Sequence, residues 1–286
     1  MENNFSKLHP LSNIVFFIFM IIFSMFTMNP ILVGIMLLES YVYFIYLNGF
    51  RSSKKLLFLV IPILIFSCII IPFFSHNGVT PLFYINDMPF TLETVIFGLV
   101  TGGVLMSVIM WLQTATNIID NEKFLYLTGR LFPTLALIVS MSFRMIPLFI
   151  RRYREIGEAQ YGIGRNPKDM KAINRFKFTI KKVSILISWS LENSVNTTMS
   201  MESRGYGVRR RSSFHLYQFK KKDAIFMIVI FALLIFPFIT LVTNGFKVYF
   251  FPEMDLLKVG IKQVISYCLI GIAGTLPFIV DLTGSK

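Results

Sequence analysis

The chain has 286 residues, of which 55% are hydrophobic, 15% aromatic and only 15% charged. With a mean hydropathy of +0.66, this composition excludes an ordinary soluble domain and indicates a membrane protein. The net charge of +13 would suggest nucleic-acid binding on a soluble surface. Residues 118–222, however, hold 20 of the 28 Lys and Arg and 7 of the 15 acids, so the excess belongs to one segment and no nucleic-acid partner is expected.

Apolar runs long enough to cross the membrane are the first predicted elements. A helix needs about 20 residues, with roughly 17 to 25 tolerated, to cross about 30 Å of hydrocarbon. Six runs meet this length: 11–28, 31–47, 56–75, 93–117, 224–243 and 263–280. We therefore predict an all-α polytopic fold, with 1–117 and 223–286 as membrane regions and 118–222 as a region of long cytoplasmic amphipathic helices.

Local features of these spans concern packing. Asn29 and Pro30 alone join the first two spans, which suits a tight helical hairpin. Gly98, Gly102 and Gly103 supply a small-residue face on which another helix can approach closely.

The orientation follows from Lys and Arg in the short loops. The loop 48–55 carries three basic residues and the loop 76–92 carries none. We therefore expect a multi-pass protein of the cell membrane with 76–92 outside and both termini and 118–222 in the cytoplasm. The loop 244–262, external in this topology, carries three Lys, but the basic block is much larger.

Two long helices are predicted inside the basic segment. Residues 134–150 are apolar but contain Arg144, and an Arg in hydrocarbon costs roughly 2.5 kcal/mol or more, so we expect this helix at the inner membrane surface. The second helix covers 173–203. One apolar stripe runs along it at helical spacing: Phe176, Ile180, Val183, Ile187, Leu191, Val195 and Met199.

The second helix is expected to end at Arg204 and Gly205. Glycine favours the left-handed conformation that ends a helix, and an arginine there complements the negative end of the dipole. The basic clusters 209–211 and 220–222 lie just before the fifth span, where each basic side chain gains about 1 kcal/mol near anionic lipid at the cytoplasmic face.

At this point the sequence resembles the transmembrane T component of energy-coupling-factor (ECF) transporters, the CbiQ/EcfT-like family. The family pattern ends in roughly A-M-E-A-R-G-Y-G, and SMESRGYG here resembles it at six positions: Met201, Glu202, Arg204, Gly205, Tyr206 and Gly207. The upstream stretch IVSMSFRMIPLFI is similar to a second family stretch and contributes Arg144 and Pro147.

A second copy of the family motif, roughly A-Q-x-A-R-G, should end the preceding helix. The sequence EAQYGIG matches it at Ala159, Gln160 and Gly164, but Ile163 stands where the family has Arg. Arg165, two residues further on, is the alternative residue for that role.

The resemblance implies an importer assembled from several chains. Two ABC-type ATPase subunits would hold ATP and Mg²⁺, a separate S component in the membrane would capture a vitamin or metal ion, and this chain would bind no cofactor. The helix ends at 159–165 and 201–206 would dock on the ATPases, since a guanidinium offers five donors in a fixed fork.

Three other classes remain as alternatives. Glu158, Ala159 and Gly164 fit the loop spacing of a conventional ABC importer permease, although the rest of that motif is absent. A secondary transporter would be expected to place ionisable groups at the membrane midplane, where the spans offer Glu39. A membrane-embedded enzyme is less favoured, because the chain has no phosphate-binding G-x-x-x-x-G-K-[ST] sequence and no clustered His and acids.

Overall fold

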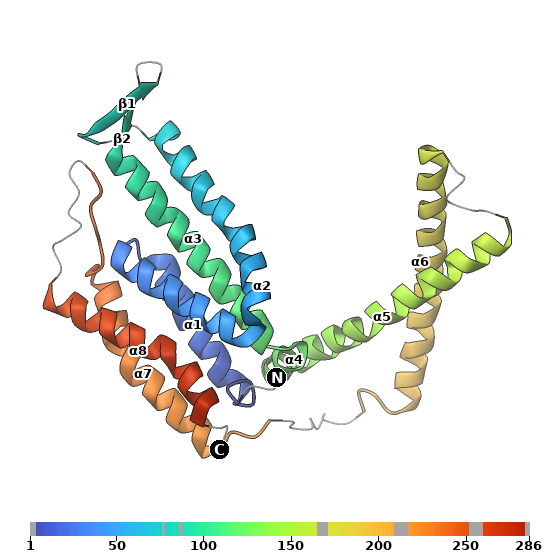
Figure 1. Ribbon diagram of the computed structural model, residues 1–286. Helices are drawn as coiled ribbons and strands as arrows, with labels where there is room; N and C mark the ends of the chain where they lie inside the picture. The colour runs from blue at the N-terminus through green and yellow to red at the C-terminus, as the bar shows by residue number, and fades with distance from the viewer. Residues whose placement is uncertain are drawn as a thin grey trace. The chain divides into compact units, whose positions relative to one another are not determined.

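The computed structural model describes residues 4–75, 78–85, 88–164, 171–208, 217–251 and 260–283. The chain forms two compact units, one of residues 1–124 and 217–286 and the other of residues 125–216. The elements labelled in Figure 1 are α1 (Pro10–Phe26), α2 (Pro30–Phe74), β1 (Pro81–Ile85), β2 (Met88–Thr91), α3 (Leu92–Ile118), α4 (Asn121–Leu131), α5 (Pro133–Gly162), α6 (Ala172–Ser203), α7 (Lys221–Val242) and α8 (Ile261–Thr283). Apart from one small hairpin, the fold is helical, in agreement with the predicted all-α polytopic membrane protein.

The first two helices begin with side-chain caps followed by proline. His9 Nδ1 accepts a hydrogen bond from the Leu11 amide at 3.2 Å, and Asn29 Oδ1 accepts one from the Ile31 amide at 3.1 Å. A proline at the first position of a helix loses no hydrogen bond, and its φ already suits the helix. The connection is short, as predicted, but it consists of residues 27–29, because α1 ends at Phe26 and Pro30 is the first residue of α2.

Helix α2 contains the second and third predicted spans, but the loop expected at 48–55 is wrong. Helical residues stand on both sides of Gly49, whose φ of 75° and ψ of 166° break the helix at this one residue. Glycine tolerates a positive φ at little cost, so one residue is enough to end the first half of α2 and start the second.

The two halves of α2 run in opposite directions along α3. In the first half, Ser40 Oγ lies 3.7 Å from Met110 Sδ, and Val33 faces Gly103. Residue numbers rise together along both helices, so this half is parallel to α3. In the second half, Ser67 Oγ donates to the Gly98 carbonyl at 3.0 Å, while Leu56 and Val60 pack with Met110. The second half is therefore antiparallel to α3, and α2 provides two crossings.

Glycines bring α3 close to α2, as the sequence predicted. A methyl group at Gly98 would lie 2.9 Å from the Ser67 carbonyl oxygen, and one at Gly102 would lie 3.1 Å from the Leu64 Cα. Gly103 faces Val33 on the other half of α2. The small-residue face therefore lets α3 pack between both halves, where close backbone approach supplies the van der Waals contact.

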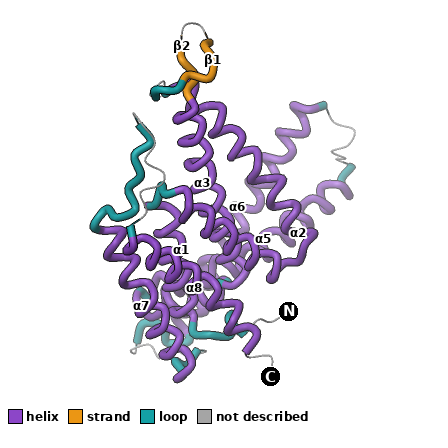
Figure 2. Tube along the Cα trace, turned by 60° about the vertical axis from the view of Figure 1, so that its left-hand side comes forward, coloured by secondary structure: helices purple, strands orange, loops and turns teal. Residues whose placement is uncertain are grey.

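A β-hairpin joins α2 to α3 within the segment expected only as an external loop. Strands β1 and β2 are antiparallel, with Pro81 opposite Thr91 and Tyr84 opposite Pro89. Figures 1 and 2 show the hairpin beyond the start of α3. Glu93, in the first turn of α3, accepts hydrogen bonds from the amide and hydroxyl of Thr80 at 3.1 and 2.6 Å, which attaches the hairpin to the helix.

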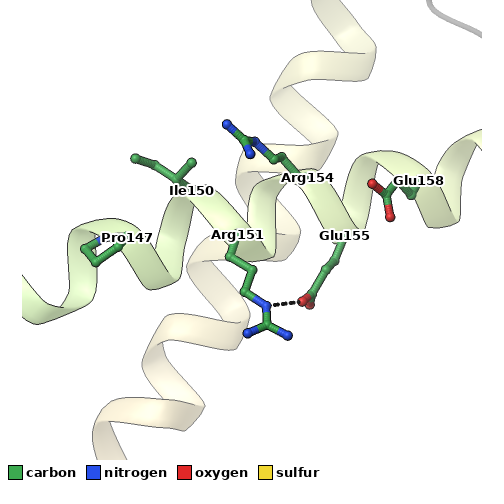
Figure 3. A pocket seen from close by; sticks show the side chains of 6 residues that line it. All are labelled: Pro147, Ile150, Arg151, Arg154, Glu155 and Glu158. Atoms are coloured by element: carbon green, nitrogen blue, oxygen red, sulfur yellow. Dashed lines mark hydrogen bonds and ion pairs between the residues drawn. The ribbon is translucent and has the colours of Figure 1, made fainter.

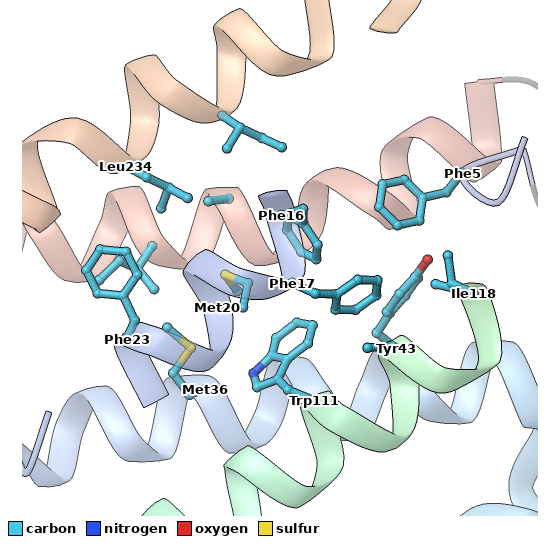
Figure 4. Packing of buried hydrophobic residues seen from close by; sticks show 14 of the residues in the cluster. Phe5, Phe16, Phe17, Met20, Phe23, Met36, Tyr43, Trp111, Ile118 and Leu234 are labelled. Carbon is cyan, nitrogen blue, oxygen red and sulfur yellow. The ribbon is translucent and has the colours of Figure 1, made fainter. Parts of the chain in front are cut away.

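The core of the first unit is aromatic and draws on α1, α2, α3, α7 and α8 (Figure 4). Trp111 of α3 is fully buried, and its ring centroid lies 5.9 Å from that of Phe16 and 6.3 Å from that of Phe17 on α1. Met36 and Leu234 complete the packing from α2 and α7. Edge-to-face pairs of this kind add to the gain from area burial alone.

The N-terminal segment is bonded to the starts of α4 and α7. Lys123 Nζ donates to the carbonyl oxygen of Ser6 at 2.6 Å, and Asp223 Oδ1 accepts from the His9 amide at 2.8 Å. Burial lowers the pKa of Lys123, although the charge of Asp120 acts in the opposite direction. The two points at which the chain leaves and re-enters the first unit therefore lie at the same end as the N-terminal segment.

The end of α8 meets the same segment. Asp281 Oδ1 accepts a hydrogen bond from the Phe5 amide at 2.7 Å, and the Phe5 side chain is fully buried. The N-terminal segment, the end of α8 and both junctions to residues 125–216 thus share one end of the first unit. Six membrane crossings, by α1, the two halves of α2, α3, α7 and α8, would produce this arrangement, because the chain crosses an even number of times before each of these points.

Five of the described helices are long and apolar enough to cross a membrane: α2, α3, α5, α7 and α8. Helix α1 is apolar and has 17 residues, which corresponds to about 26 Å at 1.5 Å per residue. Helix α5 also meets the length criterion, although we expected its apolar half at the membrane surface because of Arg144.

Candidate functional site

The second unit is built around the crossing of α5 and α6, which Figure 1 shows. Asn193 on α6 donates to the Met145 sulfur at 3.8 Å, and the ring centroids of Trp189 and Phe149 lie 6.1 Å apart. Further along α5, a methyl group at Gly157 would lie 2.7 Å from the Lys182 ammonium. Residues of increasing number on α5 contact residues of decreasing number on α6, so the two helices are antiparallel at the crossing. Their C-terminal ends therefore leave the crossing in opposite directions.

Cations on aromatic rings hold this crossing. The Arg152 guanidinium lies 5.3 Å from the centroid of the Trp189 ring, and the Lys182 ammonium lies 3.7 Å from that of Tyr153. Such pairs stabilise by about 0.5–1 kcal/mol at exposed sites. These contacts could not be predicted from the sequence, because aromatic and basic residues on two helices do not reveal which of them meet.

Beyond the crossing, the two helices have little cover. Among the described residues of α5 only Ala136 is buried, and none of α6 is. The apolar stripe predicted on α6 is helical, and its seven side chains are 41–67% exposed. Arg144 and Pro147 of α5 are also exposed. An exposed apolar stripe of this length is typical of a surface that contacts a membrane or a partner.

The C-terminal end of α6 has the geometry expected from Arg204 and Gly205. Arg204 is the cap residue, and Gly205 follows with a φ of 78°. The Tyr206 amide donates to the Met201 carbonyl at 3.0 Å, and the Gly205 amide donates to the Glu202 carbonyl at 2.9 Å. These two bonds form a Schellman motif, which fixes the last carbonyls of the helix and the direction of the chain beyond it.

The side chains at this end face outward. Arg204 and Glu202 are exposed, Met201 is partly buried and Tyr206 is 42% exposed. Within the described part of the chain, the Arg204 guanidinium has no hydrogen bond or ion pair. Its five donors are therefore held at a helix end without being used by the described residues.

The C-terminal end of α5 repeats the same backbone. Ile163 is the cap residue, Gly164 follows with a φ of 80°, and the Gly164 amide donates to the Tyr161 carbonyl at 2.9 Å. Ala159 is exposed and Gln160 is partly buried. Arg165, the alternative residue predicted for the missing arginine, lies outside the described residues.

One face of α5, along the same stretch as the crossing, lines a shallow open pocket (Figure 3). Glu155 occupies its centre and bonds Arg151 at 3.1 Å and Arg152 at 2.8 Å through its two oxygens. Arg154 and Glu158 lie on the same face. Because Arg151 is exposed and the Glu155 side chain is 40% exposed, these pairs stabilise α5 only slightly. In the described part of the chain, no three His, Cys, Asp or Glu side chains are grouped closely enough to hold a metal ion.

Comparison with known proteins agrees with this architecture. The family model CbiQ, described as cobalt transport protein, matches residues 1–216, a range that contains both helix ends. The energy-coupling factor transporter transmembrane protein EcfT of Lactobacillus helveticus (strain DPC 4571) is 29% identical over 143 residues. That match covers 46% of this chain and 52% of the relative, so the chain spans about half the length of the relative it matches. The chain belongs to the CbiQ family of cobalt transport proteins, in agreement with the resemblance of its sequence to ECF transmembrane T components.

Proposed function

We propose that the chain is the transmembrane coupling subunit of an ECF-type importer. In this role it transmits motion driven by ATP hydrolysis in two ABC-type ATPase subunits to a separate S component that captures a vitamin or metal ion. The observation that carries the proposal is the exposed Arg204 guanidinium, fixed by a Schellman motif at the end of a 32-residue helix and without a partner in the described chain.

The geometry of the second unit suits this role. A helix of 32 residues is about 48 Å long at 1.5 Å per residue and moves as a rod. A guanidinium can pair bidentately with a carboxylate on a partner, which gives the contact direction as well as energy. Because the two helix ends leave the crossing in opposite directions, they offer two separate contact points, one for each ATPase subunit.

The first unit supports the proposed topology. The N-terminal segment, the end of α8 and both junctions to the second unit share one end, so they lie on the same side of the membrane if α1, both halves of α2, α3, α7 and α8 cross it. The basic residues that follow Gly49 belong to that side as well, and we infer from their charge that it is cytoplasmic. ATP and Mg²⁺ would then bind in the partner subunits, and basic side chains of this chain would face anionic lipid.

Membership of the CbiQ family favours this function over the alternatives. A conventional ABC permease gives no account of the arginine at the end of α6. For a secondary transporter, Glu39 is the candidate acid in the spans, and its carboxylate lies against Gly271 and Gly274 of α8.

The test is co-purification of the ATPase subunits with Arg204→Glu protein from membranes. We expect this variant to insert normally and to lose the ATPase subunits together with substrate uptake. The matched control is Arg175→Glu, an exposed arginine near the start of the same helix, which should retain both. Normal retention of the ATPase subunits by Arg204→Glu would remove the docking role.

A further inference from the structure

The two helix ends have nearly the same backbone. The cap residue Ile163 has φ −87° and ψ 13°, and the cap residue Arg204 has φ −85° and ψ 5°. Each is followed by a glycine with a φ of about 80°, whose amide donates at 2.9 Å to the carbonyl three residues earlier. Ile163 is therefore the structural equivalent of Arg204, and the Cβ atoms of both residues leave the helix in the same local direction.

The side chains at the two ends differ in chemistry. From Ala159 to Gly164 the chain carries no Asp, Glu, Lys or Arg, whereas the end of α6 carries Glu202 and Arg204. Ile163 is 71% exposed and Tyr161 is 62% exposed. Methyl groups added at Gly162 or Gly164 would meet no atom of the described residues within 4 Å, so the described side chains do not cover this end.

We infer that the end of α5 binds its ATPase subunit by inserting Ile163 into an apolar pocket, with Tyr161 at the rim, whereas the end of α6 is recognised through the charge of Arg204. This inference rests on the proposed function, since it concerns how the same two helix ends meet their partners. It assigns to Ile163 the role of a specificity-determining contact.

The described residues at the α5 end offer no cation to an acidic groove. The last carbonyls of a helix carry the negative end of its dipole, and the last turn of α5 contains no basic residue. A carboxylate placed to receive an arginine would here meet a helix end of the same sign. An apolar pocket avoids this repulsion and buries the aliphatic side chain, which is favourable in proportion to its area.

Two different recognition chemistries make the helix ends non-interchangeable. A pocket shaped for isoleucine leaves a guanidinium without partners, and an acidic groove leaves isoleucine without apolar contact. Each end therefore selects its own binding surface, and the subunit can be assembled in only one orientation on the pair of ATPases.

The test measures binding of the ATPase subunits to the full-length protein in the assembled complex, purified from membranes. Ile163→Ser should weaken binding by about tenfold or more, since it removes most of the buried apolar side chain. Ile163→Val should bind nearly as well as the wild type. The matched control is Ile173→Ser on the same unit, because Ile173 is 72% exposed and lies at the start of α6.

Salt separates the two chemistries. The loss of binding affinity caused by Ile163→Ser should be the same at low and high ionic strength. The contribution of Arg204 to the affinity should instead shrink as the salt concentration rises. Unchanged binding by Ile163→Ser, or a loss produced by Arg165→Ala instead, would overturn the inference. If Arg204→Glu abolishes binding and Ile163→Ser does not, this inference alone fails; if neither variant changes binding, the proposed function fails.

Discussion

The ammonium group of Lys182 on α6 lies 3.7 Å from the centroid of the Tyr153 ring on α5. This pair, together with the contacts of Arg152 and Phe149 with Trp189, connects helices that bury almost none of their own residues. The angle between the helices therefore depends on a few cation–π and aromatic contacts. Because both helix ends lie beyond these contacts, a change in this angle displaces them.

A double-mutant cycle tests the contribution of the Lys182 pair. Lys182→Met removes the charge but keeps most of the side-chain length, and Tyr153→Leu removes the ring. We expect a coupling free energy of about 0.5–1 kcal/mol between them. Unfolding can be followed by Trp189 fluorescence in a Trp111→Phe background, since the chain has two tryptophans. The control cycle uses the exposed neighbour Lys181→Met, and equal coupling in both cycles would contradict the assignment.

The positive φ of Gly205 predicts a local effect of substitution at the end of α6. An alanine in the left-handed conformation costs about 1–2 kcal/mol, so Gly205→Ala should open the Schellman motif. The Tyr206 amide, which donates to the Met201 carbonyl, should then exchange its hydrogen about 5- to 30-fold faster.

The control for that experiment is Gly162→Ala at the end of α5. Gly162 is helical and has open space around its Cβ position, so alanine should leave exchange at Tyr206 unchanged. Identical exchange rates at Tyr206 in the Gly205→Ala protein and the wild type would show that the motif does not hold this end.

Close approach of α3 to α2 predicts a third effect. A methyl group at Gly102 would lie 3.1 Å from the Leu64 Cα, which is backbone and cannot move aside, so Gly102→Ala should destabilise the first unit by about 1–3 kcal/mol. Gly34→Ala, with no atom within 4 Å of the added methyl group, should be neutral or slightly stabilising. Thermal unfolding of the two variants in detergent checks this, and equal midpoints would contradict the packing argument.

The features predicted correctly from the sequence depend on local chemistry. The end of α6 follows from the stripe at helical spacing and from a glycine that can adopt a positive φ. The spans follow from runs of apolar residues, and the start of α2 follows from Asn29 and Pro30. These signals lie within a few residues of the feature they determine, so they do not require knowledge of the rest of the chain.

The features that were missed depend on contacts between distant residues or on one backbone angle. The reversal at Gly49 needs a single positive φ, and the polar residues around it, which resembled a loop, are helical. The hairpin at 81–91 is completed by Glu93 and Thr80, whose pairing no local pattern reveals. The same is true of Lys182 and Tyr153 at the crossing. The docking roles of the residues at 159–165 and 201–206 stay predictions, as do the structural or coupling roles of Arg144 and Pro147.

The central claim is that the end of α6, with Arg204, touches an ATPase subunit, and cross-linking from Val208 tests it most directly. Val208 is 80% exposed and lies four residues beyond Arg204, so a photoreactive residue there leaves the guanidinium intact. In membranes containing the assembled transporter, we predict an adduct between this chain and an ABC-type ATPase, identified by mass, that disappears with Arg204→Glu and persists with Arg175→Glu. An adduct formed only with lipid, or one that persists with Arg204→Glu, would contradict the account.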